Sequence, residues 1–223
     1  MKTAIGFCVL LALSIPAGAQ SAGQPSRPAA AATAAPMLAL RGFAMMTEQR
    51  FAAANTFDAE FGGKVAPFWG GGAQVVFRDR VYVEFAASRF RKTGQRAFRF
   101  NDRNFGLGIP LTSTITPVEV TGGYRFGGFA DRRVIPFAGA GFGSYAYKDT
   151  SDFSDPGENV DGRHVGYLAV GGVEFRAQRW IGLSVDAQYT HVPGILGTAG
   201  ISENAGEKDL GGIAARFRVM IGR

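Results

Sequence analysis

The chain has 223 residues, with 24 Lys and Arg, 18 Asp and Glu, 32 Gly, 10 Pro and a single Cys. Gly and Pro together stay below the share typical of disordered chains, and 19 Phe are too many for a solvated tail, so the composition excludes a disordered protein. No stretch beyond the first fifteen residues reaches the roughly 18 apolar residues of a membrane-crossing helix, which excludes a helical membrane protein.

The N-terminal segment has the features of an export signal. Lys2 supplies a positive charge, residues 4–15 form an apolar run, and residues 17–19 read Ala-Gly-Ala, a small-residue cleavage pattern. We therefore expect residues 1–19 to be a cleaved signal peptide. Cys8 lies within the segment removed, so the exported chain is expected to form no disulfide.

Beyond this signal, the chain divides into a short lead-in and one long domain. Residues 20–36 are rich in Ala and Pro and show no alternation, so we expect a flexible lead-in. Residues 37–223 contain no second linker. Apolar and polar residues alternate along this domain, most clearly at Ile181–Thr190, which reads IGLSVDAQYT. Strands with one apolar and one polar face have this pattern.

The same alternation predicts eight strands. They are expected near Leu38–Thr47, Trp69–Phe77, Val81–Ser88, Thr116–Phe126, Val134–Tyr147, Val165–Arg176, Ile181–Thr190 and Ile213–Ile221. Short and long connections alternate between them, and the long ones are expected at 48–67, 91–111, 148–164 and 191–209. Long connections that all fall on one side of an up-and-down meander are typical of transmembrane barrels.

Alternation alone does not determine whether the apolar face points inward or outward. A soluble carrier of lipocalin type keeps it inward around a ligand, whereas a membrane barrel turns it toward lipid. Three features favour lipid: 19 Arg against 5 Lys, small residues and charges of both signs on the polar face, and aromatic residues near strand ends. We therefore predict an all-β fold, an eight-stranded antiparallel up-and-down transmembrane β-barrel, with the lipocalin-like periplasmic carrier as the alternative.

In such a barrel, the charged residues of the polar face lie in the lumen. An eight-stranded interior is just wide enough to be filled by side chains, and buried charges there must pair. We expect Arg216 to pair with Glu174, and Arg78 and Arg176 to point inward. A filled lumen predicts a structural plug, with a gate or narrow conductance as the alternative. The predicted luminal polar network comprises Glu84, Glu119, Arg125, Glu174, Asp186, Arg216 and Arg218.

Two stretches resemble a known family. Residues 136–143 read PFAGAGFG, and a short turn joins GGVEF at 171–175 to WIGL at 180–183. With the export signal and the eight alternating segments, they make the chain similar to the outer-membrane β-barrel domain family, which includes OmpA-type and opacity-type small barrels. The resemblance implies the outer membrane of a two-membrane bacterium and a structural or surface-interaction role. Barrels of this family usually end in an aromatic residue, whereas this chain ends in Arg223.

The long connections predict the partners. Residues 89–103 carry six basic residues, whereas residues 148–163 carry five acidic ones. Basic residues just above the hydrocarbon predict contacts with outer-leaflet phosphates, so we expect outer-membrane lipid and lipopolysaccharide as partners, with solvated loops and internal ion pairs as the alternative. Extracellular ligands of the loops are also expected. We expect a monomer and, because the basic residues are spread along the chain, no nucleic-acid partner.

Catalytic and metal-binding motifs are nearly absent. The Gly-rich residues 139–143 lie inside a predicted strand, and the acidic connection lacks the spacing of a calcium loop. We therefore expect no enzyme activity, no metal and no cofactor. The alternative is a lipid A deacylase, because His191 resembles the catalytic histidine of that family. Glu207 would orient His191, but Pro193 stands where that family has its serine, and Ser202 would have to fold back.

Overall fold

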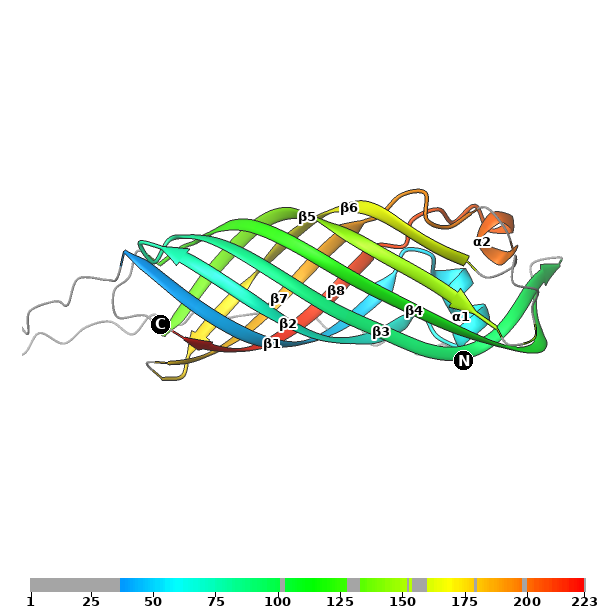
Figure 1. Ribbon diagram of the computed structural model, residues 1–223, viewed down its shortest axis with the longest axis horizontal. Helices are drawn as coiled ribbons and strands as arrows, with labels where there is room; N and C mark the ends of the chain where they lie inside the picture. Colours follow the sequence, from blue (N-terminus) through cyan, green and yellow to red (C-terminus); the bar gives the residue numbers. More distant parts are fainter. Residues whose placement is uncertain are drawn as a thin grey trace, which may run out of the picture. The chain divides into compact units, whose positions relative to one another are not determined.

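Eight antiparallel strands close into a barrel, in which each strand pairs with its neighbours in the chain and β1 pairs with β8 (Figure 1). The computed structural model describes residues 37–100, 103–127, 133–151, 153, 160–178, 180–197 and 200–222, so the predicted signal peptide and lead-in lie outside the described residues. The strands are β1 (Leu38–Phe51), β2 (Val65–Phe77), β3 (Val81–Phe100), β4 (Arg103–Arg125), β5 (Val134–Thr150), β6 (Val160–Arg176), β7 (Ile181–His191) and β8 (Gly212–Gly222). The predicted up-and-down barrel is confirmed.

The barrel has two different ends. The β2–β3, β4–β5 and β6–β7 connections lie at one, the turn end, and the other four connections lie at the opposite one, the loop end. The β2–β3 turn places Arg78 and Asp79 at positive φ, 48° and 57°, the backbone twist that suits a tight hairpin. Arg78 is exposed in this turn, so the prediction that it points into the lumen is wrong.

The predicted connection at 91–111 is also wrong, because β3 and β4 continue through it. β3 runs to Phe100 and β4 begins at Arg103, and this long hairpin projects past the other strands at the loop end (Figure 1). A shift in register between Gln95 and Ala97 interrupts the pairing. Alternation marks a strand that has one buried face, but a paired extension satisfies its backbone groups without such a face, so the sequence pattern does not reveal it.

Two short helices lie at the loop end. They are α1 (Ala54–Phe61), between β1 and β2, and α2 (Gly200–Asn204), between β7 and β8. Phe57 and Phe61 are one helical turn apart and both are buried. Gly62 follows α1 as its C-cap: it adopts the left-handed conformation, with φ of 69°, and its N–H donates to the carbonyl oxygen of Asp58 at 3.0 Å. Within the described part of the chain, neither helix combines the length and the apolar character needed to cross a membrane.

Burial alternates along the strands in the predicted phase. In β7, the apolar side chains of Val185 and Tyr189 are 55% and 54% exposed on the outside, whereas Ser184, Asp186 and Gln188 are buried inside. β8 has the same pattern, with Phe217 outside and Arg216 and Arg218 inside. The polar faces of the strands therefore meet in the interior.

Candidate functional site in the barrel interior

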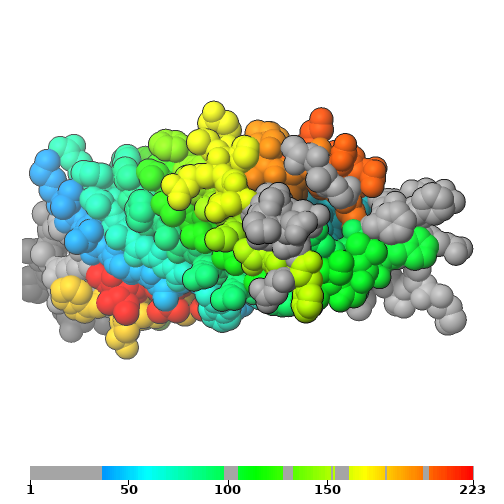
Figure 2. Space-filling view, turned by 45° about the vertical axis from the view of Figure 1, so that its right-hand side comes forward, coloured from blue at the N-terminus to red at the C-terminus, as the bar shows by residue number. Residues whose placement is uncertain are grey.

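The outer wall of the barrel exposes large apolar side chains on every strand, and successive strands make one continuous surface (Figure 2). Soluble proteins rarely expose apolar patches larger than a few hundred Å². A closed barrel also leaves no unpaired strand edge, as hydrocarbon requires. The chain is a transmembrane β-barrel. The lipocalin-like alternative is therefore wrong, because it needs the apolar face of the strands turned inward.

The sequence predicts a polar interior, but only one half of the interior of the transmembrane barrel is polar. Charged side chains occupy the half near the turn end, together with two small apolar clusters. The half near the loop end is filled by a larger apolar cluster, in which α1 and the β7–β8 connection pack against the strands. This loop-end cluster comprises Phe51, Ala53, Phe57, Phe61, Ala66, Phe68, Phe90, Ile115, Tyr145, Tyr147, Val192, Ile195, Leu196 and Leu210.

α1 occupies the mouth of the barrel through its two phenylalanines. The ring of Phe57 stacks on that of Phe51, with the centroids 3.6 Å apart and the planes at 9°. The ring of Phe61 meets Phe90 edge-on, with centroids 6.3 Å apart. Phe90 also packs against Phe68 at 5.3 Å. Because aromatic pairs of this kind add to the free energy of burial, these contacts fix the helix inside the strands and close the mouth.

The β7–β8 connection holds the N-terminal end of α1. One carboxylate oxygen of Glu207 accepts hydrogen bonds from the backbone N–H and side-chain amide of Asn55, both at 2.9 Å. The other accepts from the backbone N–H of Thr56 at 2.9 Å and from its hydroxyl at 2.7 Å. The first N–H groups of a helix have no partner within the helix, and a carboxylate there is stabilising. At the other end of α1, Nζ of Lys92 donates to the carbonyl oxygen of Phe61 at 2.9 Å.

All seven residues of the predicted luminal network are buried in the turn-end half. The structure adds Arg41 from β1, so that four arginines face four carboxylates there. Equal numbers matter because an unpaired charge in so confined a space is strongly destabilising. The eight residues are Arg41, Arg125, Arg216, Arg218, Glu84, Glu119, Glu174 and Asp186.

The central part of this network is organised by two arginines of β8. Arg218 reaches across the lumen to Oε2 of Glu84 at 2.5 Å and contacts Oδ2 of Asp186 at 2.9 Å. Arg216 donates from Nε to Oδ1 of Asp186 at 2.5 Å and lies 4.0 Å from Glu119. Because β3 and β8 are not neighbours in the sheet, the contact between Arg218 and Glu84 ties opposite walls of the barrel together.

Glu174 forms the centre of a second group nearer the turn end. Its carboxylate accepts from Arg41 at 2.9 Å and from Arg125 at 2.9 Å. Arg125 and Arg176 both contact Oδ1 of Asp79, at 2.5 and 2.6 Å. The predicted pair between Arg216 and Glu174 is therefore wrong: Arg216 meets Asp186 and Glu119, because the tilt and stagger of the strands decide which luminal residues share a level.

Sequence reasoning missed Arg41 and Asp79 for different reasons. Along β1, both faces carry apolar residues, since Phe43 and Met45 point inward and Leu38 and Leu40 outward. The alternation that would assign Arg41 to the lumen is therefore weak. Asp79 belongs to a turn, and only the closed barrel brings it beneath Arg125 and Arg176.

Tyr145 connects the two halves of the interior. Its ring belongs to the loop-end cluster, and its hydroxyl donates to Oε1 of Glu119 at 2.6 Å. Gln188 donates to the same oxygen at 3.0 Å and also to Oγ1 of Thr190 at 2.9 Å. The apolar plug and the ion pairs thus form one continuous filling.

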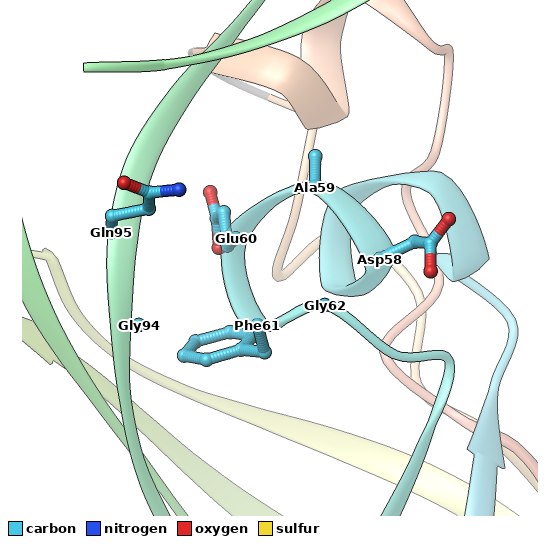
Figure 3. A pocket seen from close by; sticks show the side chains of 7 residues that line it. All are labelled: Asp58, Ala59, Glu60, Phe61, Gly62, Gly94 and Gln95. Atoms are coloured by element: carbon cyan, nitrogen blue, oxygen red, sulfur yellow. The ribbon is translucent and has the colours of Figure 1, made fainter. Parts of the chain in front are cut away.

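A cavity of about 610 Å³ lies between the C-terminal end of α1 and β3 (Figure 3). Figure 3 shows the Glu60 side chain on the side of the helix that faces Gln95. Burial, and then the nearby charge of Asp149, raise the pKa of Glu60 to about 8 against the opposing charge of Arg96. Glu60 is therefore mostly protonated at neutral pH. The cavity is lined by Asp58, Ala59, Glu60, Phe61, Gly62, Gly94 and Gln95.

His191 has a carboxylate partner, but a different one from the residue expected. Its Nδ1 lies 2.8 Å from Oδ2 of Asp209, whereas Glu207 is engaged by α1. Partial burial raises the pKa of Asp209, but hydrogen bonds from the N–H of Val192, from His191 and from the N–H of Gly211 outweigh it. The pKa of Asp209 is therefore lowered. The hydroxyl of Ser202, the serine considered as nucleophile, accepts from the N–H of Gly197 at 3.0 Å.

The described residues include no group of three or more His, Cys, Asp or Glu placed to hold a metal ion. The luminal carboxylates are each matched by arginines, which leaves little room for a cation among them. The luminal arginines and carboxylates neutralise one another and fill the turn-end half of the interior of the barrel.

No protein-family model and no curated protein matches the chain. Similar solved structures include small eight-stranded outer-membrane barrels. The N-terminal β-barrel domain of Pseudomonas aeruginosa OprF is 12% identical over 83% of this chain and 97% of that one, with a TM-score of 0.49. Ail, the attachment invasion locus protein of Yersinia pestis, solved with the heparin analogue sucrose octasulfate, is 12% identical over 83% and 97%, with a TM-score of 0.47.

Neisserial surface protein A is 10% identical to this chain and covers 84% of it and 96% of its own length, with a TM-score of 0.44. At such low identity and with TM-scores below 0.5, these likenesses carry no information on function. Function has to be argued from the interior and the surface of this barrel.

Proposed function

We propose that this protein is a closed, non-conducting barrel of the bacterial outer membrane that anchors and presents the structures at its loop end. The observation that carries this is the continuous filling of the interior, by α1 and the aromatic rings in one half and by paired charges in the other. A path for solutes would need both to be displaced. A structural or surface-interaction role is what such a barrel supports.

The orientation follows from the two ends. Short turns on the inner side and long connections outside are the arrangement of outer-membrane barrels. We therefore place the turn end and the N-terminus in the periplasm and α1, α2 and the β3–β4 hairpin at the cell surface. Export by the signal peptide predicts that the mature chain begins at Gln20, which N-terminal sequencing of the membrane-bound protein tests directly.

Membrane fractionation and surface proteolysis test the location. We expect the protein in the outer-membrane fraction, released only by detergent, with an unheated sample migrating differently from a heated one on gels. Protease added to intact cells should cut at the loop end and leave the turn end intact. Recovery of the protein from the soluble periplasmic fraction would overturn the proposed location. Cleavage of the protein at the β2–β3 turn by protease added to intact cells would overturn the proposed orientation.

Planar lipid bilayers test the closed interior. The purified barrel is expected to show no stepwise conductance at neutral pH. A variant with Phe57→Ser and Phe61→Ser, which weakens only the packing of α1, should also stay closed, because the ion pairs of the turn-end half remain in place. Stable conductance steps from the unaltered protein would show that the interior conducts, and the proposal would fail.

The enzyme alternative has a separate test. Expression of the protein in a bacterium with known lipid A should leave the number of acyl chains on lipid A unchanged, as measured by mass spectrometry. Removal of an acyl chain by the unaltered protein, but not by the His191→Ala variant, would establish deacylation and place His191 in a catalytic role.

A further inference from the structure

Four basic side chains lie close together on the outward face of β3, β5 and β6, near the loop end. Arg89 and Arg91 belong to β3, Lys148 to β5 and Arg163 to β6, and all four are exposed. We call these four residues the outer basic patch. β3 to β6 are successive neighbours in the wall, so the patch lies on one arc of the barrel.

The strand register shows how close these residues lie. Arg91 is opposite Thr114 of β4, and Thr114 is opposite Lys148 of β5, so one hydroxyl lies between two cations. Adjacent strands are about 4.8 Å apart, which puts the backbones of Arg91 and Lys148 roughly 10 Å apart. Arg163 is opposite Ala146, two residues before Lys148, so Lys148 and Arg163 are diagonal neighbours within reach of long side chains.

The four bases of the patch have no partner among the residues that the structure describes. None of them forms a hydrogen bond or an ion pair with another residue that the structure describes. Within the described part of this surface, one acid, Asp161, stands directly opposite Lys148 in the register. Among the described residues of this surface, the four bases therefore outnumber the one acid.

The patch directly continues the apolar wall. Toward the turn end, the next large outward side chains on these four strands are Phe85, Val118, Phe142 and Val165, which are 51%, 36%, 58% and 60% exposed. With about 3.3 Å per residue, the bases stand within the first one to two nanometres beyond these side chains. This is the depth at which lipid headgroups meet water, and Arg and Lys bind phosphate there.

We infer that the outer basic patch binds the phosphorylated headgroup of an outer-leaflet glycolipid, with its acyl chains lying against Phe85, Val118, Phe142 and Val165. This inference rests on the proposed placement in the outer membrane. A lipid is favoured over a soluble anion because the bases are on the wall, continuous with apolar surface, whereas a soluble anion needs no such neighbour. The hydroxyl of Thr114 supplies a further donor between Arg91 and Lys148.

Binding is measured with the full barrel in detergent micelles, titrated with bisphosphorylated lipid A or with the same lipid stripped of its phosphates. Trp69 pairs with Arg89 in the register, so its fluorescence in a Trp180→Phe background reports on the patch. The variant is Arg91→Gln with Lys148→Gln. The matched control is Arg50→Gln with Lys64→Gln, which removes two exposed bases at the same end but outside the patch.

We expect the bisphosphorylated lipid to bind in preference to the dephosphorylated one. The patch variant should bind it about 25-fold more weakly, roughly fivefold for each base removed, whereas the control should change little. The shift in gel mobility on heating verifies that each variant is folded. Equal affinities of the patch variant and the unaltered barrel would overturn the inference.

Two further arms identify the source of the phosphate. Inorganic pyrophosphate should not displace the lipid at equal concentration, and sucrose octasulfate should not bind more tightly than the lipid. Displacement by pyrophosphate, or tighter binding of the sulfated sugar, would make the patch a site for soluble anions. A barrel that inserts into the outer membrane but binds lipid independently of the patch contradicts only this inference, whereas failure of insertion contradicts the proposed function.

Discussion

The hydroxyl of Tyr145 donates a 2.6 Å hydrogen bond to Oε1 of Glu119, and through this contact the aromatic plug rests on the ion pairs below it. Tyr145→Phe keeps the ring but removes the donor to a buried carboxylate. A hydrogen bond to a charged group contributes about 1.5–3 kcal/mol, so the free energy of unfolding should fall by that amount.

Urea unfolding of the purified barrel, followed by gel mobility, measures this change. Tyr124→Phe is the matched control, because Tyr124 is 40% exposed on the outer wall near the turn end. It should leave the unfolding midpoint unchanged. Equal effects of the two substitutions would show that the contact with Glu119 does not hold the halves together.

Arg216 and Asp186 should be energetically coupled, since Nε of Arg216 lies 2.5 Å from Oδ1 of Asp186. Arg216→Ala removes one of the two arginines that contact Asp186 and the arginine nearest Glu119, and is expected to cost about 3–5 kcal/mol. Adding Asp186→Ala should cost less than the sum of the two single changes, with a coupling of about 0.5–3 kcal/mol.

The contrasting cycle combines Arg216→Ala with Glu174→Ala. Glu174 is held by Arg41 and Arg125 and shares no partner with Arg216, so these losses should add to within about 0.5 kcal/mol. Denaturant unfolding of the unaltered barrel, the three single variants and the two double variants decides the matter. Strong coupling in this second cycle would mean that the ion pairs are arranged differently.

Glu207→Ala should loosen α1 without unfolding the barrel. The substitution removes four hydrogen bonds to Asn55 and Thr56 and the negative charge at the start of the helix. Protection of the α1 amides from hydrogen exchange should fall at least tenfold, equivalent to about 1.4 kcal/mol. Amides of β7 and β8 should keep their protection. Glu203→Ala, at an exposed site in α2, is the control, and an equal loss of protection there would count against a specific role for Glu207.

The seating of α1 should weaken as the pH rises. The pKa of Glu60 is about 8 when the helix is seated and near 4.5 when the side chain is free in water. The seated state therefore binds more protons, so its stability is greatest below pH 4.5 and declines between pH 4.5 and pH 8. Above pH 8 the loss is complete.

Hydrogen exchange of the α1 amides, corrected for the intrinsic effect of pH on exchange, measures this trend. Glu60→Gln cannot ionise and should flatten the dependence, with α1 better protected than in the unaltered protein at pH 8. Asp58→Asn, on the exposed side of the same helix, should leave the slope in place. A slope that persists in Glu60→Gln would assign the titration to another group.

Which residues line the interior was largely predictable from the sequence. The side-chain period of a strand is two, so once Ile181, Val185 and Tyr189 are assigned to lipid, Ser184 and Asp186 are inside without any knowledge of the tertiary structure. Glu84, Glu119, Glu174 and the arginines of β8 follow in the same way.

The structure of the long connections was less predictable, because it depends on contacts with residues that are distant in the sequence. α1 contains only a weak signal, Phe57 and Phe61 at helical spacing before Gly62, and Ala53 offers no capping side chain. Its cap comes from Glu207, which is 152 residues away from Asn55. A short helix of this kind is unstable by itself and exists because the barrel mouth buries it.

The sequence by itself determined which residues share a face of each strand, because the face depends only on a residue's parity along the strand, and the excess of Arg, the small residues of the polar face and the aromatic strand ends indicated that the apolar face meets lipid. The tertiary structure alone decided that Arg218 meets Glu84, that Arg216 meets Asp186, and that Glu174 meets Arg41. Such pairs depend on the tilt and stagger with which the eight strands close, and these are properties of the whole barrel rather than of any one segment.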